Sequence, residues 1–143
     1  MVKYPTGTMI RFKNKPRKVT KKNKFNAHGV EIDGQHFDSK VEGRYYQHLK
    51  DLKLDFKVHE EFEILPAFDL EHPHKHERNC KYTPDFTIYD NGKLKSAIDV
   101  KGASATLTTA SRLRMKMFMY KYLTPVVIAT YDRKNGVFRE QIK

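Results

Sequence analysis

The chain has 143 residues, 38% of them hydrophobic, and 28 basic against 17 acidic residues give it a formal net charge of +11. This composition suits one folded domain with its own core. It excludes a helical membrane protein, because no apolar run approaches the ~20 residues that span a bilayer. The first residues lack a secretory signal pattern, and the single cysteine, Cys80, cannot form an internal disulfide. We therefore expect a cytoplasmic protein with no membrane partner.

Most of the positive charge lies near the N-terminus. Residues 1–30 hold nine basic residues and no acidic one, whereas the two kinds nearly balance in the rest of the chain. We expect residues 1–27 to form a basic arm and residues 28–143 to form one domain. Such an arm suits DNA and predicts binding that weakens steeply with salt; the alternative is a solubilising tail. The candidate DNA contacts in the arm are Lys13, Lys15, Arg17, Lys18, Lys21, Lys22 and Lys24.

The first predicted elements of the domain are a hairpin and a helix. Apolar and polar residues alternate over residues 30–37 around Asp33 and Gly34, a pattern typical of a hairpin with a tight turn. Ser39 is a candidate N-cap for the helix that follows. Apolar residues then recur at helical spacing, so we expect this helix to continue to about Leu54.

Three strands are predicted in the middle of the chain. In the first of them, apolar and acidic residues alternate from Glu61 to Ile64. A polar, histidine-rich connection over residues 69–79 leads to the second strand, and a strong turn signal at Asn91–Gly92 joins the second to the third. The predicted strands are residues 56–68, 82–89 and 95–100.

A second helix is predicted over residues 106–123. Pro125 ends it and begins a short buried strand over residues 125–130. The order of helix, three strands, helix and strand predicts an α/β fold in which helices flank a mixed sheet. The apolar stripe of the second helix is predicted to contain Ala110, Leu113, Met117 and Tyr120.

Two acidic residues and a lysine are candidates for catalysis on the predicted strands. Asp99 and Lys101 are two residues apart on one strand, so both project from the same face. The turn decides whether Asp85 joins them. A three-residue loop, with Gly92 as a left-handed bulge residue, pairs Asp85 with Ala97 and makes Asp85 a diagonal neighbour of Asp99 on that face. A two-residue loop would put the two carboxylates on opposite faces; we favour the three-residue loop.

These residue types suit the hydrolysis of a phosphodiester. Carboxylates can hold Mg²⁺, and a lysine can orient or deprotonate the attacking water. Glu42 is a third candidate acid, because it lies next to the apolar stripe of the first helix and can face the edge of the sheet. Ser39 and Glu42 also have the spacing of a capping box. Strand carboxylates beside lysines are common, so spacing alone leaves both interpretations open.

Three segments, in this order and spacing, resemble the motifs of the PD-(D/E)XK nuclease superfamily: Phe37–Glu42, Tyr82–Phe86 and Ile98–Gly102. More closely, residues 24–130 resemble a family of small bacteriophage proteins related to the phage endonuclease I type of Holliday-junction resolvase. The ordered set of motifs is fairly specific, whereas any one motif alone is not. Asp99 departs from the family pattern, which more often has Glu at this position, and the shorter side chain shifts the expected metal position.

The resemblance implies a restriction-endonuclease-like core, dependence on Mg²⁺ with Mn²⁺ as a substitute, and nicking of branched DNA, often by a homodimer. It implies catalytic roles for Glu42, Asp85, Asp99 and Lys101. By this resemblance Asp85 bridges the metal ions, with Asp99 and the Val100 carbonyl beside it. Glu42 binds a second metal or the nucleophilic water, and Lys101 positions that water or neutralises the phosphorane.

The second helix is the other candidate contact with DNA. Arg112, Arg114 and Lys116 are basic, and Arg112 and Lys116 share a face, so these two are the best candidates for the scissile phosphate. The alternative is an ordinary solvated helix face. The histidines and Cys80 within residues 72–80 invite a zinc interpretation, but their spacing fits no common closed site, which favours a polar hairpin tip. His48 and His59 are expected to be packed rather than catalytic.

The sequence therefore predicts a Mg²⁺-dependent endonuclease that cuts Holliday junctions or other branched DNA. Two alternatives stay open. One is a nickase or a sequence-specific nuclease on the same core. The other is a DNA-binding accessory protein without catalytic activity, held to DNA by its basic arm.

Overall fold

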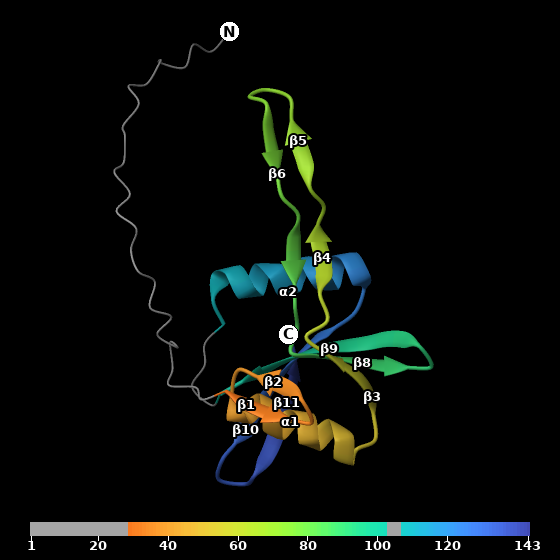
Figure 1. Ribbon diagram of the computed structural model, residues 1–143, viewed down its shortest axis with the longest axis vertical. Coiled ribbons are helices and arrows are strands. Elements are labelled where there is room, and N and C mark those ends of the chain that lie inside the picture. The colour runs from red at the N-terminus through yellow and green to blue at the C-terminus, as the bar shows by residue number, and fades with distance from the viewer. Residues whose placement is uncertain (1–28, 103–106) are drawn as a thin grey trace, which may run out of the picture.

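The computed structural model describes residues 29–102 and 107–143 of the chain (Figure 1). They form an α/β fold with a mixed sheet and two helices, as predicted. None of the described helices is long and apolar enough to cross a membrane. The predicted arm over residues 1–27 lies outside the described residues. So do its candidate DNA contacts, Lys13, Lys15, Arg17, Lys18, Lys21, Lys22 and Lys24.

The two helices and eleven strands of the described residues follow one another in a simple order. They are β1 (Val30–Ile32), β2 (Gln35–Phe37), α1 (Lys40–Asp51), β3 (Asp55–Val58), β4 (Phe62–Leu65), β5 (Phe68–Leu70), β6 (Lys75–Glu77), β7 (Cys80–Tyr82), β8 (Phe86–Asp90), β9 (Lys93–Lys101), α2 (Thr109–Tyr122), β10 (Val126–Asp132) and β11 (Val137–Ile142).

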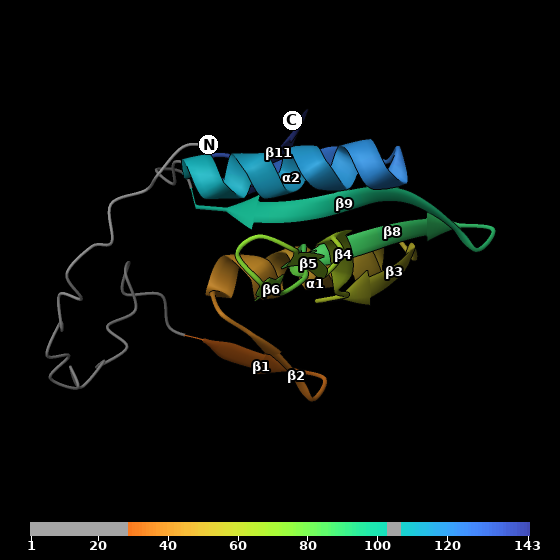
Figure 2. The same cartoon turned by 90° about the horizontal axis from the view of Figure 1, so that it is seen from above.

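Five strands form the central sheet, in the order β11-β10-β9-β8-β3. The pair β9 and β10 is parallel and is joined through α2, while the other neighbours are antiparallel. Such a parallel pair needs a crossover connection, and α2 supplies it. Figure 2 shows α2 on one side of the sheet and α1 on the other. The last strand, β11, was missed by the sequence analysis.

Each helix covers its own hydrophobic core. Strand β9 contributes to both cores, because successive side chains of a strand point to opposite faces. Ile98 and Val100 are buried with residues of α1, whereas Ala97 is buried with Met115 and Phe118 of α2. This alternation places Asp99, between Ile98 and Val100, on the α2 side of the sheet.

The hairpin and the first helix form as predicted. Asp33 and Gly34 both have positive φ, 53° and 73°, as a two-residue turn of this kind requires. Ser39 caps α1 by accepting a hydrogen bond from the Glu42 N–H. The helix ends at Asp51, three residues before the predicted end at Leu54.

Gly43 lets α1 approach the hairpin closely. A Cβ atom at this position would lie 2.8 Å from Val30 Cγ2 and 2.9 Å from Ile32 Cδ1. An alanine gains about 1 kcal/mol in helix propensity, but overpacking costs about 1–3 kcal/mol. We predict that Gly43→Ala lowers the free energy of unfolding by about 1 kcal/mol in urea denaturation. The exposed Gln47→Ala on the same helix is the control, and a Gly43→Ala protein more stable than wild type would contradict this packing.

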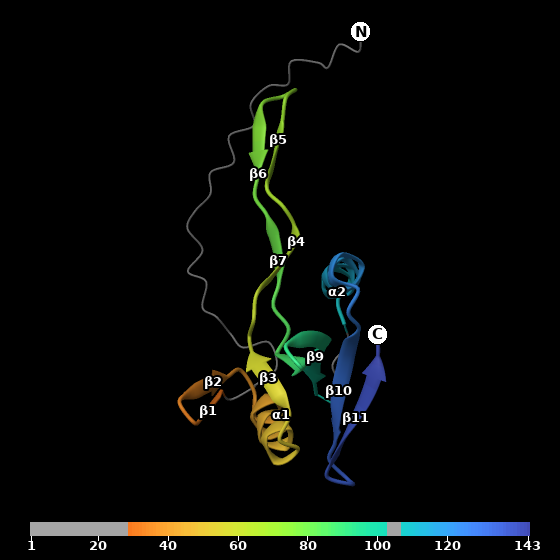
Figure 3. The ribbon, with the colours of Figure 1, turned by 90° about the vertical axis from the view of Figure 1, so that its right-hand side faces the viewer.

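The predicted single strand over residues 56–68 is wrong: it is divided into β3, β4 and β5. His59 has a left-handed backbone, with φ of 50°, and this turns the chain out of the central sheet. The strands that follow pair as β4 with β7 and β5 with β6. They form one long two-stranded ribbon that projects from the domain (Figures 1 and 3). The histidine-rich residues 72–76 lie at its far end, as the predicted hairpin tip.

The predicted apolar stripe of the second helix is wrong. Leu113 and Tyr120 are 57% and 85% exposed, whereas Met115 and Phe118 are fully buried. Phe62, at the base of the ribbon, sets which face of α2 is buried, because its ring packs against the Phe118 ring with 5.0 Å between the ring centroids. Both faces of this helix contain apolar residues, so the sequence pattern alone did not distinguish them.

Candidate functional site

Asp85 and Asp99 face each other across two antiparallel strands. The turn between β8 and β9 has two residues, Asn91 and Gly92, with φ of 50° and 73°, so the predicted three-residue loop is wrong. A bulge then adds one extra residue, Lys95, to β9, because Tyr89 pairs with Leu94 while Ile88 pairs with Ser96. The predicted pairing of Asp85 with Ala97 is also wrong, since Ala97 pairs with Thr87.

The bulge changes the register in which the two acids approach each other. A two-residue turn alone would have put the two carboxylates on opposite faces. The extra residue shifts the register by one, and Phe86 pairs with Ile98. Asp85 lies in the bend just before β8, and continuing this register by one residue sets it opposite Asp99. The carboxylates are direct neighbours rather than the predicted diagonal ones.

Pro84 explains why Asp85 stands at the end of a strand. The pairing of β8 with β9 stops at Phe86, and a proline cannot donate a backbone hydrogen bond to continue it. The Val100 N–H instead donates to Asp85 Oδ2 at 2.6 Å. The N–H and C=O groups of one strand residue point to the same side. The Val100 carbonyl, a predicted metal ligand, is thereby directed toward Asp85.

Asp85 lies among negative charges in a poorly solvated position. Burial raises the pKa of Asp85 to about 8, and the charges of Asp99 and Glu42 add to this, against the Val100 N–H and Lys101, which lower it. Clustered carboxylates of this kind are stabilised by a bound cation.

Lys101 places a positive charge beside Asp99. Its Nζ lies 2.9 Å from Asp99 Oδ2, and the Asp99 residue is only 7% exposed. The two side chains project from one face of β9, two residues apart, as predicted. Lys101 is therefore close enough to act on the same bound group as Asp99.

Glu42 is part of the helix cap and also lies beside Asp85, so both interpretations that the sequence left open describe it. Its Oε2 accepts a hydrogen bond from the Asp38 N–H and its Oε1 accepts one from Ser39 Oγ, as part of a cap on α1. The same carboxylate faces Asp85, whose pKa it helps to raise. Burial raises the pKa of Glu42, which its two capping hydrogen bonds oppose. The cap thus holds the carboxylate in one orientation beside the sheet.

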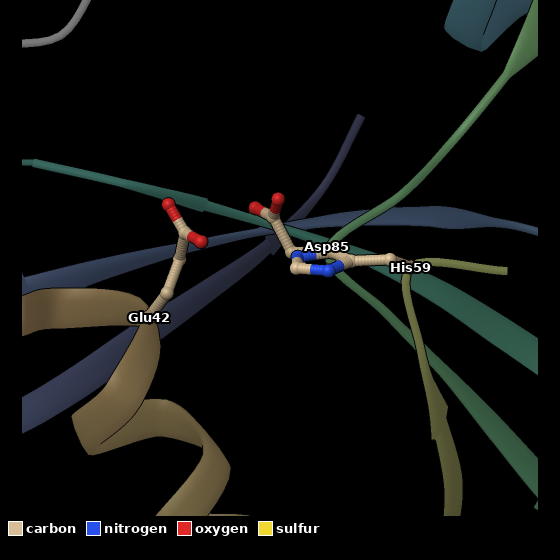
Figure 4. A group of neighbouring side chains, drawn as sticks. All are labelled: Glu42, His59 and Asp85. Atoms are coloured by element: carbon tan, nitrogen blue, oxygen red, sulfur yellow. The ribbon is translucent and has the colours of Figure 1, made fainter. Parts of the chain in front are cut away.

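His59 joins the site, although it was expected from the sequence to be packed rather than catalytic. One donor atom from each of Glu42, His59 and Asp85 lies within 4.8 Å of the other two. Figure 4 shows these side chains reaching toward one another from α1, from the bend after β3 and from the bend just before β8. His59 also packs against the Phe37 ring, at 6.2 Å between centroids. A lone histidine within an apparent strand gives no sequence signal for a metal site.

The donor set fits a divalent cation. Carboxylates and carbonyls are the preferred ligands of Mg²⁺ and Mn²⁺, and Glu42, Asp85 and Asp99 gather at one end of the sheet. The Tyr82 hydroxyl gives an independent indication. It is buried, has no hydrogen-bond partner among the described residues, and has a pKa raised by burial and by the charges of Asp99 and Asp85. A buried hydroxyl without a partner is uncommon in a folded protein.

Arg112 lies near the site, but the other predicted helix contacts are more distant from it. A hollow of about 390 Å³ is lined by Lys101, Arg112 and Lys143, together with polar and apolar residues of the sheet. Arg114 and Lys116 are exposed on α2 and do not line this hollow. The hollow places three cationic side chains together, which suits a phosphate.

The histidine-rich tip of the ribbon contains no cluster of metal-binding groups among the residues that the structure describes. His76 Nδ1 instead lies 2.8 Å from Asp69 Oδ1, across the β5–β6 pair. Cys80 is exposed and unpaired. His48 packs against the Phe138 and Tyr45 rings, as expected.

The fold and the site define an α/β protein with a mixed sheet and an acidic cluster that includes a histidine. A family described as “Protein of unknown function (DUF1064)” matches residues 22–133, and the chain belongs to this family. The match includes the whole site, from Glu42 to Lys101, and all of α2. No curated protein and no solved structure matches the chain.

Proposed function

We propose that this protein is a metal-dependent DNA endonuclease with a restriction-endonuclease-like core, selective for Holliday junctions or other branched DNA. The proposal depends above all on one observation: the Asp85 carboxylate, bonded to the Val100 N–H, lies close enough to Asp99 for that charge to raise its pKa, and Lys101 lies 2.9 Å from Asp99. Two carboxylates and a lysine at the end of a strand pair agree with the resemblance to PD-(D/E)XK nucleases. The position of Glu42 beside Asp85 agrees with it too.

Each residue of the site has a role in the proposed hydrolysis. Asp85, Asp99 and the Val100 carbonyl would hold a divalent ion, Mg²⁺ or Mn²⁺, and Glu42 would hold a second one. A bound ion would supply Lewis acidity toward the scissile phosphate. Lys101 Nζ, held by Asp99, would orient the attacking water or balance the negative charge that develops on the phosphate.

We expect the cationic residues to contact the phosphates of the DNA backbone. Arg112 would contact a phosphate next to the scissile one, because it lines the same hollow as Lys101. Arg114, Lys116 and the basic residues within 1–27 would add contacts that carry no sequence information. Cutting two strands of a junction needs two active sites, so we expect the active form to be a homodimer.

Cleavage of a labelled four-way junction, measured beside a linear duplex of the same sequence, tests the proposal. We expect nicking of the junction in Mg²⁺ or Mn²⁺, none in EDTA, and none with Asp85→Ala, which should still bind the junction. Asp90→Ala, an exposed carboxylate on the same strand, is the matched control and should cut normally.

The same assay separates the alternative functions. Equal cleavage of linear duplex would indicate a nickase or a sequence-specific nuclease on this core. Tight, salt-sensitive binding without cleavage of either substrate would contradict the enzyme and favour a DNA-binding accessory protein. Loss of binding together with cleavage in Asp85→Ala would mean that Asp85 is structural.

A further inference from the structure

His59 has no role in the nuclease chemistry proposed above, yet its ring lies with two of the acids of that site. One nitrogen of its ring and one oxygen from each of Glu42 and Asp85 lie within 4.8 Å of one another. An ion with bonds of about 2.1 Å holds its ligand atoms about 3–4 Å apart. Small side-chain rotations are therefore enough to bring these three atoms around one ion (Figure 4).

The backbone of His59 is fixed to that of Asp85. The His59 N–H donates to the Asp85 carbonyl at 3.1 Å, and the imidazole packs against Phe37 on its other side. The His59 backbone is left-handed, with φ of 50°, a conformation that Gly and Asn adopt more readily than other residues. The backbone that carries the imidazole is thus fixed to Asp85, the residue with which His59 would share a metal ion.

A nitrogen ligand changes which metal the site prefers. Mg²⁺ favours oxygen ligands and keeps several waters, whereas imidazole is a good ligand for first-row transition ions. The position formed by Asp85, Asp99 and the Val100 carbonyl has only oxygen ligands. The position formed by Glu42, His59 and Asp85 has two oxygens and one nitrogen.

We propose that Glu42, His59 and Asp85 form a metal site that binds a first-row transition ion, such as Mn²⁺, in preference to Mg²⁺. The inference deepens the proposed function, since it rests on the same site and names the metal for one of its two positions.

Mn²⁺ is the probe for the test, because it is paramagnetic and binds most weakly of the transition ions in the usual affinity order. Titration of the full-length protein with Mn²⁺ and with Mg²⁺, without DNA, gives the two affinities. We expect Mn²⁺ to bind about tenfold tighter or more. Electron spin-echo spectroscopy of the bound Mn²⁺ should show coupling to an imidazole nitrogen.

Two substitutions at the same position make the test specific. His59→Asn supplies an oxygen ligand and suits the left-handed backbone, so it should lose the nitrogen coupling and the preference for Mn²⁺ while still binding Mg²⁺. His59→Gly should lose the coupling and regain it on addition of free imidazole. His48→Asn, whose ring packs on Phe138, is the control and should keep both properties.

The inference fails if wild-type protein binds no Mn²⁺, if bound Mn²⁺ shows no nitrogen coupling, or if His59→Asn keeps the preference for Mn²⁺. None of these readouts involves DNA, so they are independent of the nuclease. A protein that binds Mn²⁺ through His59 but cuts no DNA would overturn the proposed function and leave this inference intact.

Discussion

Lys101→Met is expected to lower the rate of junction cleavage by about 10²–10⁴-fold, the range for loss of one positioned proton-transfer group. The Lys101 ammonium lies 2.9 Å from Asp99 Oδ2, where it can act on the water or on the phosphate. Methionine keeps an apolar stem of nearly the same length and removes the ammonium group. The measurement is single-turnover cleavage of the labelled junction in saturating Mg²⁺.

Metal binding distinguishes a catalytic lysine from a structural one. Removing the ammonium leaves Asp99, which is 7% exposed, without its partner, so a cation should bind there at least as tightly as in the wild type. We therefore expect unchanged or higher Mg²⁺ affinity in Lys101→Met, together with slow cleavage. Lys95→Met removes an exposed lysine from the bulge of the same strand and should cut normally. Parallel loss of cleavage and of metal affinity in Lys101→Met would contradict the catalytic role.

The candidate acids could be predicted from the sequence, but their register could not. Asp85, Asp99 and Lys101 follow strand patterns that the order of motifs makes recognisable. The register depends on a turn and a bulge that compensate each other, and Lys95 has no side-chain feature that marks it as the bulge residue. The predicted proximity of the two acids was therefore derived from a loop length that the structure contradicts.

The remaining differences arise from contacts between distant parts of the chain. His59 comes beside Glu42 and Asp85 only because its left-handed backbone directs the chain out of the sheet. The orientation of α2 depends on Phe62 at the base of the ribbon, which packs on Phe118. Local periodicity contains neither kind of information.

Asp85→Asn is expected to make the metal-free protein more stable at pH 8, in contrast to its expected loss of cleavage. Burial, with the charges of Asp99 and Glu42, raises the pKa of Asp85 from an ordinary value of 3.8 to about 8. Between these two values the unfolded chain has released the proton and the folded protein retains it. The stability of the metal-free protein should therefore fall as the pH rises from about 4 to about 8.

Asparagine cannot ionise, so it removes the free-energy cost of keeping Asp85 buried among negative charges. It also keeps an oxygen that can accept the hydrogen bond from the Val100 N–H. Each pKa unit corresponds to ~1.4 kcal/mol. Because Asp85 keeps some contact with solvent, we expect a gain in the free energy of unfolding of about 2–5 kcal/mol at pH 8. At pH 4 the gain should be small. Urea denaturation in EDTA at the two pH values measures both.

Divalent ions should stabilise the wild type more than Asp85→Asn. Mn²⁺ or Mg²⁺ should stabilise the wild type at pH 8, since an ion that binds only the folded state shifts the unfolding equilibrium, and it should stabilise Asp85→Asn much less. Asp90→Asn, an exposed carboxylate on the same strand, should change stability by no more than about 0.5 kcal/mol at either pH. An Asp85→Asn protein less stable than wild type in EDTA at pH 8 would show that the charged carboxylate supports the fold. A gain confined to the metal-free protein would show that the fold tolerates a destabilising cluster of acids because a cation binds there.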